Sequence, residues 1–222
     1  LEHFDNLLVL SETGTGKTCE IVGFLEMARD YFNKQDKDIG IDKEGIAHFK
    51  KMYIFVKNGT LKKELRKQIV CSCTDGRYIT EQLLKVTTES GQKGSVTSIL
   101  KAAGYVIMTY ATASNEISKL LVNPVTGEQI YNLDDPKVTK ELHEMFDDSI
   151  IWFDEAHNLV SEIEGEQKPK PKPGKGNPPK EEIYRNMHHV LHLARRSKRI
   201  LSTATPMINK VDELADLLNL IL

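Results

Sequence analysis

The strongest constraint on the fold is the alternation of short, almost continuously apolar runs with longer amphipathic segments. Strands with one solvent-exposed face alternate apolar and polar residues, whereas continuous apolar runs are typical of strands that helices cover on both faces. The expected strands are 6–10, 52–57, 105–110, 149–154 and 199–204. The expected helices are 18–33, 60–70, 113–122, 137–147, 183–198 and 209–221. The pattern predicts an α/β fold with a mainly parallel sheet, helices on both faces and right-handed crossovers.

Composition narrows the class of protein. The 222-residue chain is 40% hydrophobic and 28% charged, as ordinary globular proteins are. Its net charge of −2 gives no global attraction to nucleic acid, so any basic surface must be local. No apolar run approaches the roughly 20 residues that span a bilayer, so we expect neither a membrane partner nor a signal peptide. Cys19, Cys71 and Cys73 suit a reducing, intracellular compartment and lack the ligand pairs of a zinc site.

The stretch SETGTGKT, residues 11–18, follows the first expected strand and opens the first expected helix. Its two glycines let successive backbone N–H groups point into one concavity that holds phosphate oxygens. Lys17 would add a positive charge at the β and γ phosphates, and the Thr18 hydroxyl would bind Mg²⁺. The pattern G-x-x-x-x-G-K-[ST] is met except that Ser11 replaces its first glycine. The alternative is a plain glycine-rich turn. The predicted nucleotide-binding residues are Ser11, Glu12, Thr13, Gly14, Thr15, Gly16, Lys17 and Thr18.

A second stretch, IIWFDEAHNL, places Asp154 and Glu155 at the end of a buried strand, where open α/β sheets bind ligands. Asp154 can hold Mg²⁺ there, usually through water, which completes the site begun by Thr18. Glu155 is then placed to orient and deprotonate the attacking water. Acids at a strand end are often simply solvated. The phosphate loop about 137 residues earlier makes the catalytic interpretation specific.

Two further stretches have both a structural and a functional interpretation. In LSTATP, residues 201–206, hydroxyl side chains could hydrogen-bond to His157 and the acidic pair, or could simply cap a strand end. In FVKNGTLKKELRKQ, residues 55–68, a tight turn precedes a basic helix for which Thr60 is the expected N-cap. The cations of this stretch form either a solvated helix face or a set of phosphate contacts. They are Lys57, Lys62, Lys63, Arg66 and Lys67.

Residues 164–182, EGEQKPKPKPGKGNPPKEE, are rich in proline and lysine and cannot build a core. We expect a disordered surface insertion there, with a polycationic arm that touches phosphates as the alternative. His188, His189 and His192 lack a carboxylate or cysteine at ligand spacing, so we expect a helix face rather than a metal site.

Taken together, the four stretches resemble the first RecA-like domain of a superfamily 2 helicase. SETGTGKT is similar to motif I, VKNGTLKKEL to motif Ia, DEAH to motif II and STATP to motif III, in that order. VIMTYAT, residues 106–112, resembles the TTY segment that precedes motif II in this group. The resemblance spans nearly the whole chain. It implies a RecA-like P-loop NTPase domain over residues 1–222, built as a three-layer sandwich, and ATP-driven movement on nucleic acid.

The resemblance also implies roles for individual residues. Lys17 and Thr18 would bind the triphosphate of ATP and Mg²⁺, while Asp154 and Glu155 would serve the metal and the water. The residues implied to couple hydrolysis to motion are His157, Thr203 and Thr205. The residues implied to contact DNA or RNA, on the motif Ia side, are Lys57, Asn58, Lys62, Thr109 and Tyr110.

The sequence is compatible with several branches of this superfamily. DEAH alone suggests RNA helicases, whereas STATPMINKVDELADLLNLI is more similar to Swi/Snf-type DNA translocases, and to the nucleoside triphosphate phosphohydrolases and early transcription factors of large DNA viruses. The main hypothesis is DNA translocation linked to transcription, with the transcription machinery as partner and a virion or host cytoplasm as location. The alternatives are an RNA helicase and another P-loop NTPase, such as a restriction-enzyme motor subunit. The second RecA-like domain is expected to be missing from the chain, which would leave ATP hydrolysis very slow.

Overall fold

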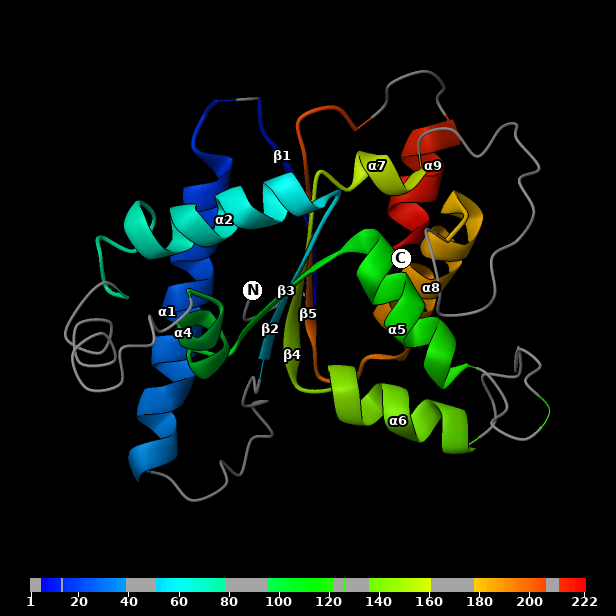
Figure 1. Cartoon of the computed structure of the whole chain (residues 1–222), viewed down its shortest axis with the longest axis horizontal. Coiled ribbons are helices and arrows are strands. Elements are labelled where there is room, and N and C mark those ends of the chain that lie inside the picture. The colour runs from blue at the N-terminus through cyan, green and yellow to red at the C-terminus, as the bar shows by residue number, and fades with distance from the viewer. Residues whose placement is uncertain are drawn as a thin grey trace, which may run out of the picture.

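The computed structural model describes residues 5–12, 14–38, 51–78, 96–121, 126, 136–160, 178–206 and 212–222. Its centre is a five-stranded parallel sheet with the order β1-β5-β4-β2-β3 (Figure 1). The strands are β1 (Asn6–Leu10), β2 (Lys51–Val56), β3 (Tyr105–Thr109), β4 (Ser149–Asp154) and β5 (Lys198–Thr203). Each end lies within one residue of an expected strand end, which confirms the α/β prediction.

Helices connect the strands. They are α1 (Lys17–Asp38), α2 (Gly59–Cys71), α4 (Val96–Ala102), α5 (Tyr110–Leu120), α6 (Pro136–Phe146), α7 (His157–Val160), α8 (Lys180–Leu193) and α9 (Asp212–Asn219). Every expected helix is present, while α4 and the short α7 were not expected. Within the part of the chain described above, no helix is both long and apolar enough to cross a lipid bilayer.

Two hydrophobic clusters cover the two faces of the sheet. Successive residues of a strand point to opposite faces. In β4, Ile151 and Phe153 therefore pack with α5, α6, α7, α8 and α9, whereas Ile150 and Trp152 pack with α1, α2 and α4. Figure 1 shows these two groups of helices on opposite sides of the sheet. Because helices cover both faces of the sheet, the strands are continuously apolar. The sheet and its two layers of helices form the three-layer α/β sandwich that the resemblance implies.

The predicted insertion at 164–182 is ordered at its end. Residues 164–177 lie outside the described part of the chain. Pro178 is buried, and α8 begins at Lys180 with two glutamates in its first turn, where they favour the helix dipole. Glu182 accepts a hydrogen bond from the Ser118 hydroxyl at 2.7 Å. The prediction of disorder was therefore wrong for residues 178–182.

The strand order brings distant segments to one edge of the sheet. All carboxyl ends of a parallel sheet lie at the same edge, and β5 lies between β1 and β4. The register pairs Leu10 with Thr203 and Ser202 with Asp154. The loops that follow these three strands, which carry the stretches at 11–18, 154–157 and 203–206, therefore meet.

Candidate nucleotide-binding site

The loop after β1 has the backbone that phosphate binding requires. Gly14 and Gly16 have φ angles of 85° and 90°, in the left-handed region that glycine enters at no steric cost. Apart from the residues next to each glycine in the chain, no heavy atom of the described residues lies within 4 Å of a Cβ built on either one, so backbone conformation rather than space favours glycine there. The Gly16 carbonyl accepts hydrogen bonds from the backbone N of Cys19 and Glu20 at 2.9 and 3.1 Å, which begins α1. The positive end of the α1 dipole thus points at the loop.

Ser11 replaces the first glycine of the phosphate-loop pattern and is accommodated. Its backbone N donates to the Thr203 carbonyl at 3.2 Å, and its hydroxyl hydrogen-bonds with the Thr15 hydroxyl. The Thr15 hydroxyl donates in turn to the Glu12 carbonyl at 2.9 Å. Hydrogen bonds of its own side chains therefore hold the loop in its turn. Thr13 lies outside the described residues.

Lys17, the first residue of α1, is buried and ion-paired. Its Nζ lies 2.8 Å from Glu155 Oε1, and 8% of its side chain is exposed. A hydrogen bond with His157, whose Nδ1 lies 3.3 Å from Glu155 Oε2, lowers the pKa of Glu155 to about 2, and Lys17 adds to this effect. Glu155 is therefore ionised near neutral pH, and it holds the lysine where phosphate would bind.

Asp154 lies deeper than its neighbour. Burial raises the pKa of its carboxyl, and the charge of Glu155 raises it further against the opposing effect of Lys17. The Ser202 hydroxyl lies 3.2 Å from Asp154 Oδ1 and accepts a hydrogen bond from the Trp152 indole at 2.8 Å. A buried carboxyl group whose pKa is raised in this way suits a divalent cation, because the cation favours the ionised form of the acid.

The donor set fits Mg²⁺ rather than a metal held by a protein cage. Mg²⁺ usually takes one or two carboxylates and completes its shell with water and substrate phosphates. In the segments that the structure describes, no three His, Cys, Asp or Glu side chains are placed to hold a metal ion together. Asp154 at the end of β4 and Thr18 in the first turn of α1 are the residues that would hold Mg²⁺ at this edge.

The three predicted coupling residues meet beside Glu155. His157 Nδ1 lies 2.7 Å from Thr203 Oγ1 and 3.4 Å from Thr205 Oγ1. The Thr205 backbone N donates to Thr203 Oγ1 at 3.1 Å. The shortest contact makes Thr203 the main partner of the imidazole. These bonds join the first turn of α7 to the segment that leaves β5.

The backbone of the Asp-Glu turn is strained and firmly held. Glu155 has a φ of 54°, a left-handed conformation that costs a non-glycine residue roughly 1–3 kcal/mol. Four hydrogen bonds hold the turn. Tyr110 Oη donates to the Asp154 carbonyl at 2.7 Å and Ala156 N to the Ser202 carbonyl at 2.9 Å, while the backbone N and the Nδ2 of Asn158 both donate to the Glu155 carbonyl, at 3.0 and 2.9 Å. They fix the direction in which the Glu155 side chain leaves the strand.

Tyr110 differs from its expected role as a nucleic-acid contact. It is 4% exposed, its ring lies 6.2 Å from that of Phe153, and its hydroxyl is used by Asp154. Burial raises the pKa of this hydroxyl well above its usual value. The assignment was wrong because Tyr110 opens α5 and its side chain faces the core. Thr109 beside it is the N-cap of α5 and accepts a hydrogen bond from Thr112 N at 3.2 Å.

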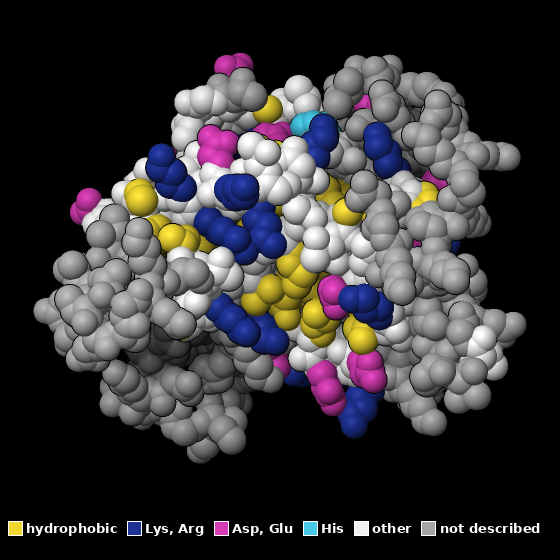
Figure 2. Space-filling view, viewed as in Figure 1, with side chains coloured by type: hydrophobic (Ala, Val, Ile, Leu, Met, Phe, Trp, Pro, Cys, Tyr) yellow, Lys and Arg dark blue, Asp and Glu magenta, His cyan; other side chains and the backbone are white. Residues whose placement is uncertain are grey.

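The other predicted nucleic-acid residues lie at the start of α2. Lys57 and Asn58 are exposed, and Lys62 is half-buried, where burial and the charge of Arg66 lower its pKa. Figure 2 shows Lys and Arg side chains gathered over α2. The side-chain oxygen of Asn58 accepts hydrogen bonds from the backbone N of Thr60 and Leu61, each at 3.0 Å. Asn58, not Thr60, is therefore the N-cap of this basic helix.

The sequence did not predict the disulfide that the structure shows. Cys19, directly after Thr18, forms a disulfide with Cys73, while Cys71 is free and exposed. The two bonded cysteines lie 54 residues apart, and no local pattern signals their pairing.

Comparison with known proteins agrees with this geometry. A sequence model of the family described as "Type III restriction enzyme, res subunit" matches residues 2–208. The chain is 27% identical over 219 residues to "Putative helicase 087L" of Invertebrate iridescent virus 3, covering 99% of this chain and 18% of that protein. It is 26% identical over 223 residues to "Putative helicase 009L" of Frog virus 3 (isolate Goorha), with the same two coverages. The chain thus spans about 18% of the length of these relatives.

The family description names the restriction-enzyme motor subunit that the sequence left open as an alternative, whereas both relatives are helicases by name. The chain therefore belongs to the type III restriction enzyme res-subunit family and is a RecA-like domain of the superfamily 2 helicase type, similar to helicases of large DNA viruses.

Proposed function

We propose that this chain binds Mg²⁺–ATP at residues 11–18 and serves as the first half of a motor that moves on DNA. The observation that carries the proposal is the Lys17–Glu155 pair, in which side chains 138 residues apart meet at 2.8 Å. The pair lies where three loops converge, beside a second carboxylate. A plain glycine-rich turn would not account for a buried lysine against two acids.

Each residue of the site then has one task. On nucleotide binding, Lys17 exchanges Glu155 for phosphate oxygens. Losing Lys17 removes one of the two side chains that lower the pKa of Glu155, so the carboxylate becomes a better base for the attacking water. Asp154, oriented by Ser202, and Thr18 hold Mg²⁺, which when bound offsets charge on the transferred phosphoryl group. Backbone N–H groups of the loop bind the remaining phosphate oxygens.

Coupling to movement passes through the contacts of His157. Its imidazole contacts both Glu155 and Thr203, so a change in the contacts of Glu155 alters those of Thr203 at the end of β5. Thr205 joins the same set of bonds. In our proposal this segment transmits the state of the nucleotide to a second RecA-like domain of the same polypeptide. The greater length of the relatives supports this.

The nucleic-acid track runs over the start of α2, where Lys57 and Lys62 lie, and over Thr109. We propose DNA as the track, supported by the similarity of the segment from Ser202 onward to DNA translocases. A link to viral transcription is supported by the resemblance to early transcription factors. The DEAH sequence favours the alternative, an RNA helicase.

The test is titration of a fluorescent Mg²⁺–ATP analogue. Lys17→Ala should weaken binding at least about tenfold, because the phosphates lose their buried cation. Lys17→Arg keeps a charge opposite Glu155, and it should also bind poorly because a guanidinium does not fit the loop. Lys101→Ala, on the exposed side of α4, is the matched control and should bind normally. Unchanged affinity in a folded Lys17→Ala protein would contradict the assignment.

A further inference from the structure

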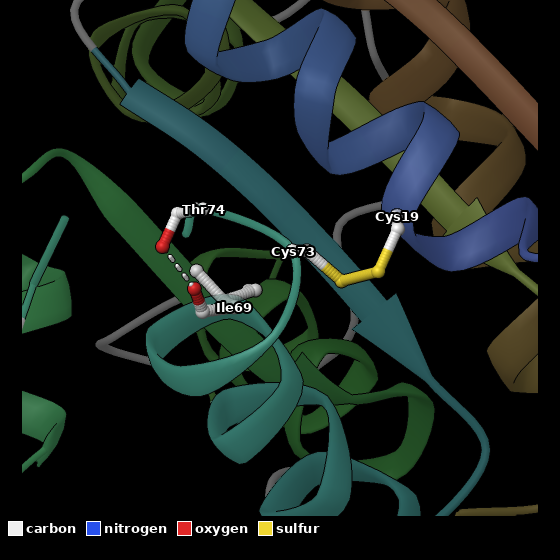
Figure 3. Close-up of a disulfide and its surroundings, with 4 residues drawn as sticks. All are labelled: Cys19, Ile69, Cys73 and Thr74. Carbon is white, nitrogen blue, oxygen red and sulfur yellow. Dashed lines mark hydrogen bonds between the residues drawn. A yellow bond between two sulfur atoms is a disulfide. The ribbon is translucent and has the colours of Figure 1, made fainter. Parts of the chain in front are cut away.

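The Cys19–Cys73 disulfide joins the nucleotide loop to the end of α2. Cys19 follows Thr18 in the first turn of α1, and Cys73 lies just beyond α2; Figure 3 shows the bond between them. Cys19 is exposed and Cys73 is half-buried. A disulfide sulfur that faces solvent is open to attack by an external thiolate.

The Cys73 end of the bond is rigidly held. The backbone N of Ser72 and of Cys73 both donate to the Gln68 carbonyl, at 2.9 and 2.8 Å. The Thr74 hydroxyl donates to the carbonyl of Ile69, a fully buried residue, at 2.6 Å (Figure 3). Cys73 therefore moves with the core.

The Cys19 end belongs to the phosphate loop. Its backbone N donates to the Gly16 carbonyl, and both residues are exposed. In the described residues, the disulfide is a covalent link between this end of α1 and the segment after α2, and it adds to the packing of Ile21 and Val22 against α2. The bond thus transmits the rigidity of the core to the loop that binds phosphate.

A second, non-covalent attachment lies farther along α1. Arg77 contacts Glu26 at 3.0 Å and Asp30 at 2.8 Å, and the Tyr78 hydroxyl donates to Glu26. Glu26 is about two turns beyond Cys19. Opening the disulfide therefore leaves the segment after α2 attached to α1, and it removes the covalent restraint on the first turn, where Lys17 keeps its ion pair with Glu155.

We propose that the Cys19–Cys73 disulfide is a thiol–disulfide exchange site for a dithiol reductant, and that its state sets the affinity of the phosphate loop for nucleotide. The inference rests on the proposed nucleotide-binding function. A reductant thiolate attacks the exposed sulfur of Cys19, and Cys73 leaves as a thiolate. The second thiol of the reductant then attacks the mixed disulfide and expels Cys19. Two electrons pass to the protein, both cysteines end as thiols after protonation, and the reductant ends as a disulfide.

The oxidised form binds nucleotide more tightly. With the disulfide closed, the first turn of α1 is already held against the core, so less order has to be gained on binding. In the reduced form the turn from Gly16 to Cys19 lacks this covalent restraint, so more of its order has to be gained on binding, which weakens affinity by on the order of tenfold.

The experiment compares the oxidised and dithiothreitol-reduced forms of the native chain, with thiol counting to verify each state. Mg²⁺–ATP analogue affinity and amide hydrogen exchange across residues 14–20 are measured on both forms. Reduction should weaken binding and speed exchange in the wild type and in Cys71→Ser, the matched control, which keeps the disulfide. Cys19→Ser and Cys73→Ser should each resemble the reduced form and ignore the reductant.

The outcomes separate the two proposals. Equal affinities in oxidised and reduced protein that both bind nucleotide overturn the exchange site as a control of binding. A disulfide that dithiothreitol opens only in denatured protein overturns it as well. If neither form binds nucleotide, the proposed function fails, and hydrogen exchange decides the inference alone: unchanged exchange across 14–20 on reduction overturns it.

Discussion

At the scale of single residues, Asp154 and Glu155 are neighbours whose pKa values are shifted in opposite directions. Glu155 touches Lys17 and His157, so its pKa is lowered to about 2, whereas burial raises that of Asp154. Adjacent acids whose pKa values are shifted apart in this way take different roles in catalytic sites. The ionised, partly exposed Glu155 suits a base, and the buried Asp154 suits a metal ligand.

Asp154→Asn should raise the free energy of unfolding of the nucleotide-free chain by about 1 kcal/mol near neutral pH. The substitution removes a buried charge beside Glu155, and the amide oxygen can still accept from Ser202. Above the raised pKa the native state carries an unfavourable charge, while below the pKa of the unfolded chain Asp154 is protonated in both states. The advantage should therefore shrink as the pH falls through the raised pKa. Urea denaturation from about pH 7 to about pH 4 measures it.

Asp75→Asn, at an exposed turn, is the control and should change stability little at any pH. A variant at Asp154 that is less stable than the wild type, or whose advantage stays constant with pH, would show that burial does not disfavour this carboxylate.

At the scale of elements, α5 holds the turn at Asp154 and Glu155 in place. The first residue of α5, Tyr110, donates its hydroxyl to the Asp154 carbonyl, and the residue before it, Thr109, is a predicted nucleic-acid contact. The helix start therefore lies between the proposed nucleic-acid track and the acidic pair. This makes Tyr110 a positioning residue for the strained Glu155 turn.

Tyr110→Phe should cost about 1 kcal/mol of stability. It should also speed amide hydrogen exchange across residues 154–158, because the turn loses the hydrogen bond that Tyr110 donates to the Asp154 carbonyl. Tyr53→Phe is the matched control, since Tyr53 donates to the Met145 carbonyl at the same 2.7 Å but away from the acidic turn. Its loss should cost similar stability without changing exchange at 154–158. Equal exchange profiles in the two variants would refute the positioning role.

Elements were predictable where one local pattern decides them. The strands could be found because burial on both faces leaves continuous apolar runs, as in β4 with Ile150 to Phe153. Helix starts were missed where a single side chain decides them, such as the Thr109 cap that begins α5 three residues before the expected 113. The individual contacts of the site could not be predicted from the sequence. Lys17–Glu155, Tyr110–Asp154 and Cys19–Cys73 join residues 138, 44 and 54 positions apart. Such pairs are set by strand order, which no short pattern records.

At the scale of the whole molecule, the site faces outward from one edge of a single sheet. In the described segments, Lys17 and His157 are the basic side chains that form ion-pair contacts with the acidic pair, both through Glu155. Phosphoryl transfer depends mainly on positioning and on positive charge at the γ phosphate in the transition state. In related NTPases an arginine finger supplies roughly three to five orders of magnitude in rate. We expect that arginine to come from the second RecA-like domain.

The 222-residue chain should therefore bind Mg²⁺–ATP but hydrolyse it barely above background, and DNA should stimulate it little. A longer polypeptide that includes the second domain should show DNA-dependent turnover, because closure of two domains across the nucleotide completes the charge around the γ phosphate. Steady-state phosphate release with and without DNA measures both, and RNA in place of DNA tests the alternative track. Glu155→Gln in the longer polypeptide is the control for contaminating activity, since its amide cannot take the proton of water while Lys17 remains free for phosphate. Robust DNA-stimulated hydrolysis by the monomeric 222-residue chain would contradict the two-domain mechanism, because every group needed for turnover would then lie at this one edge.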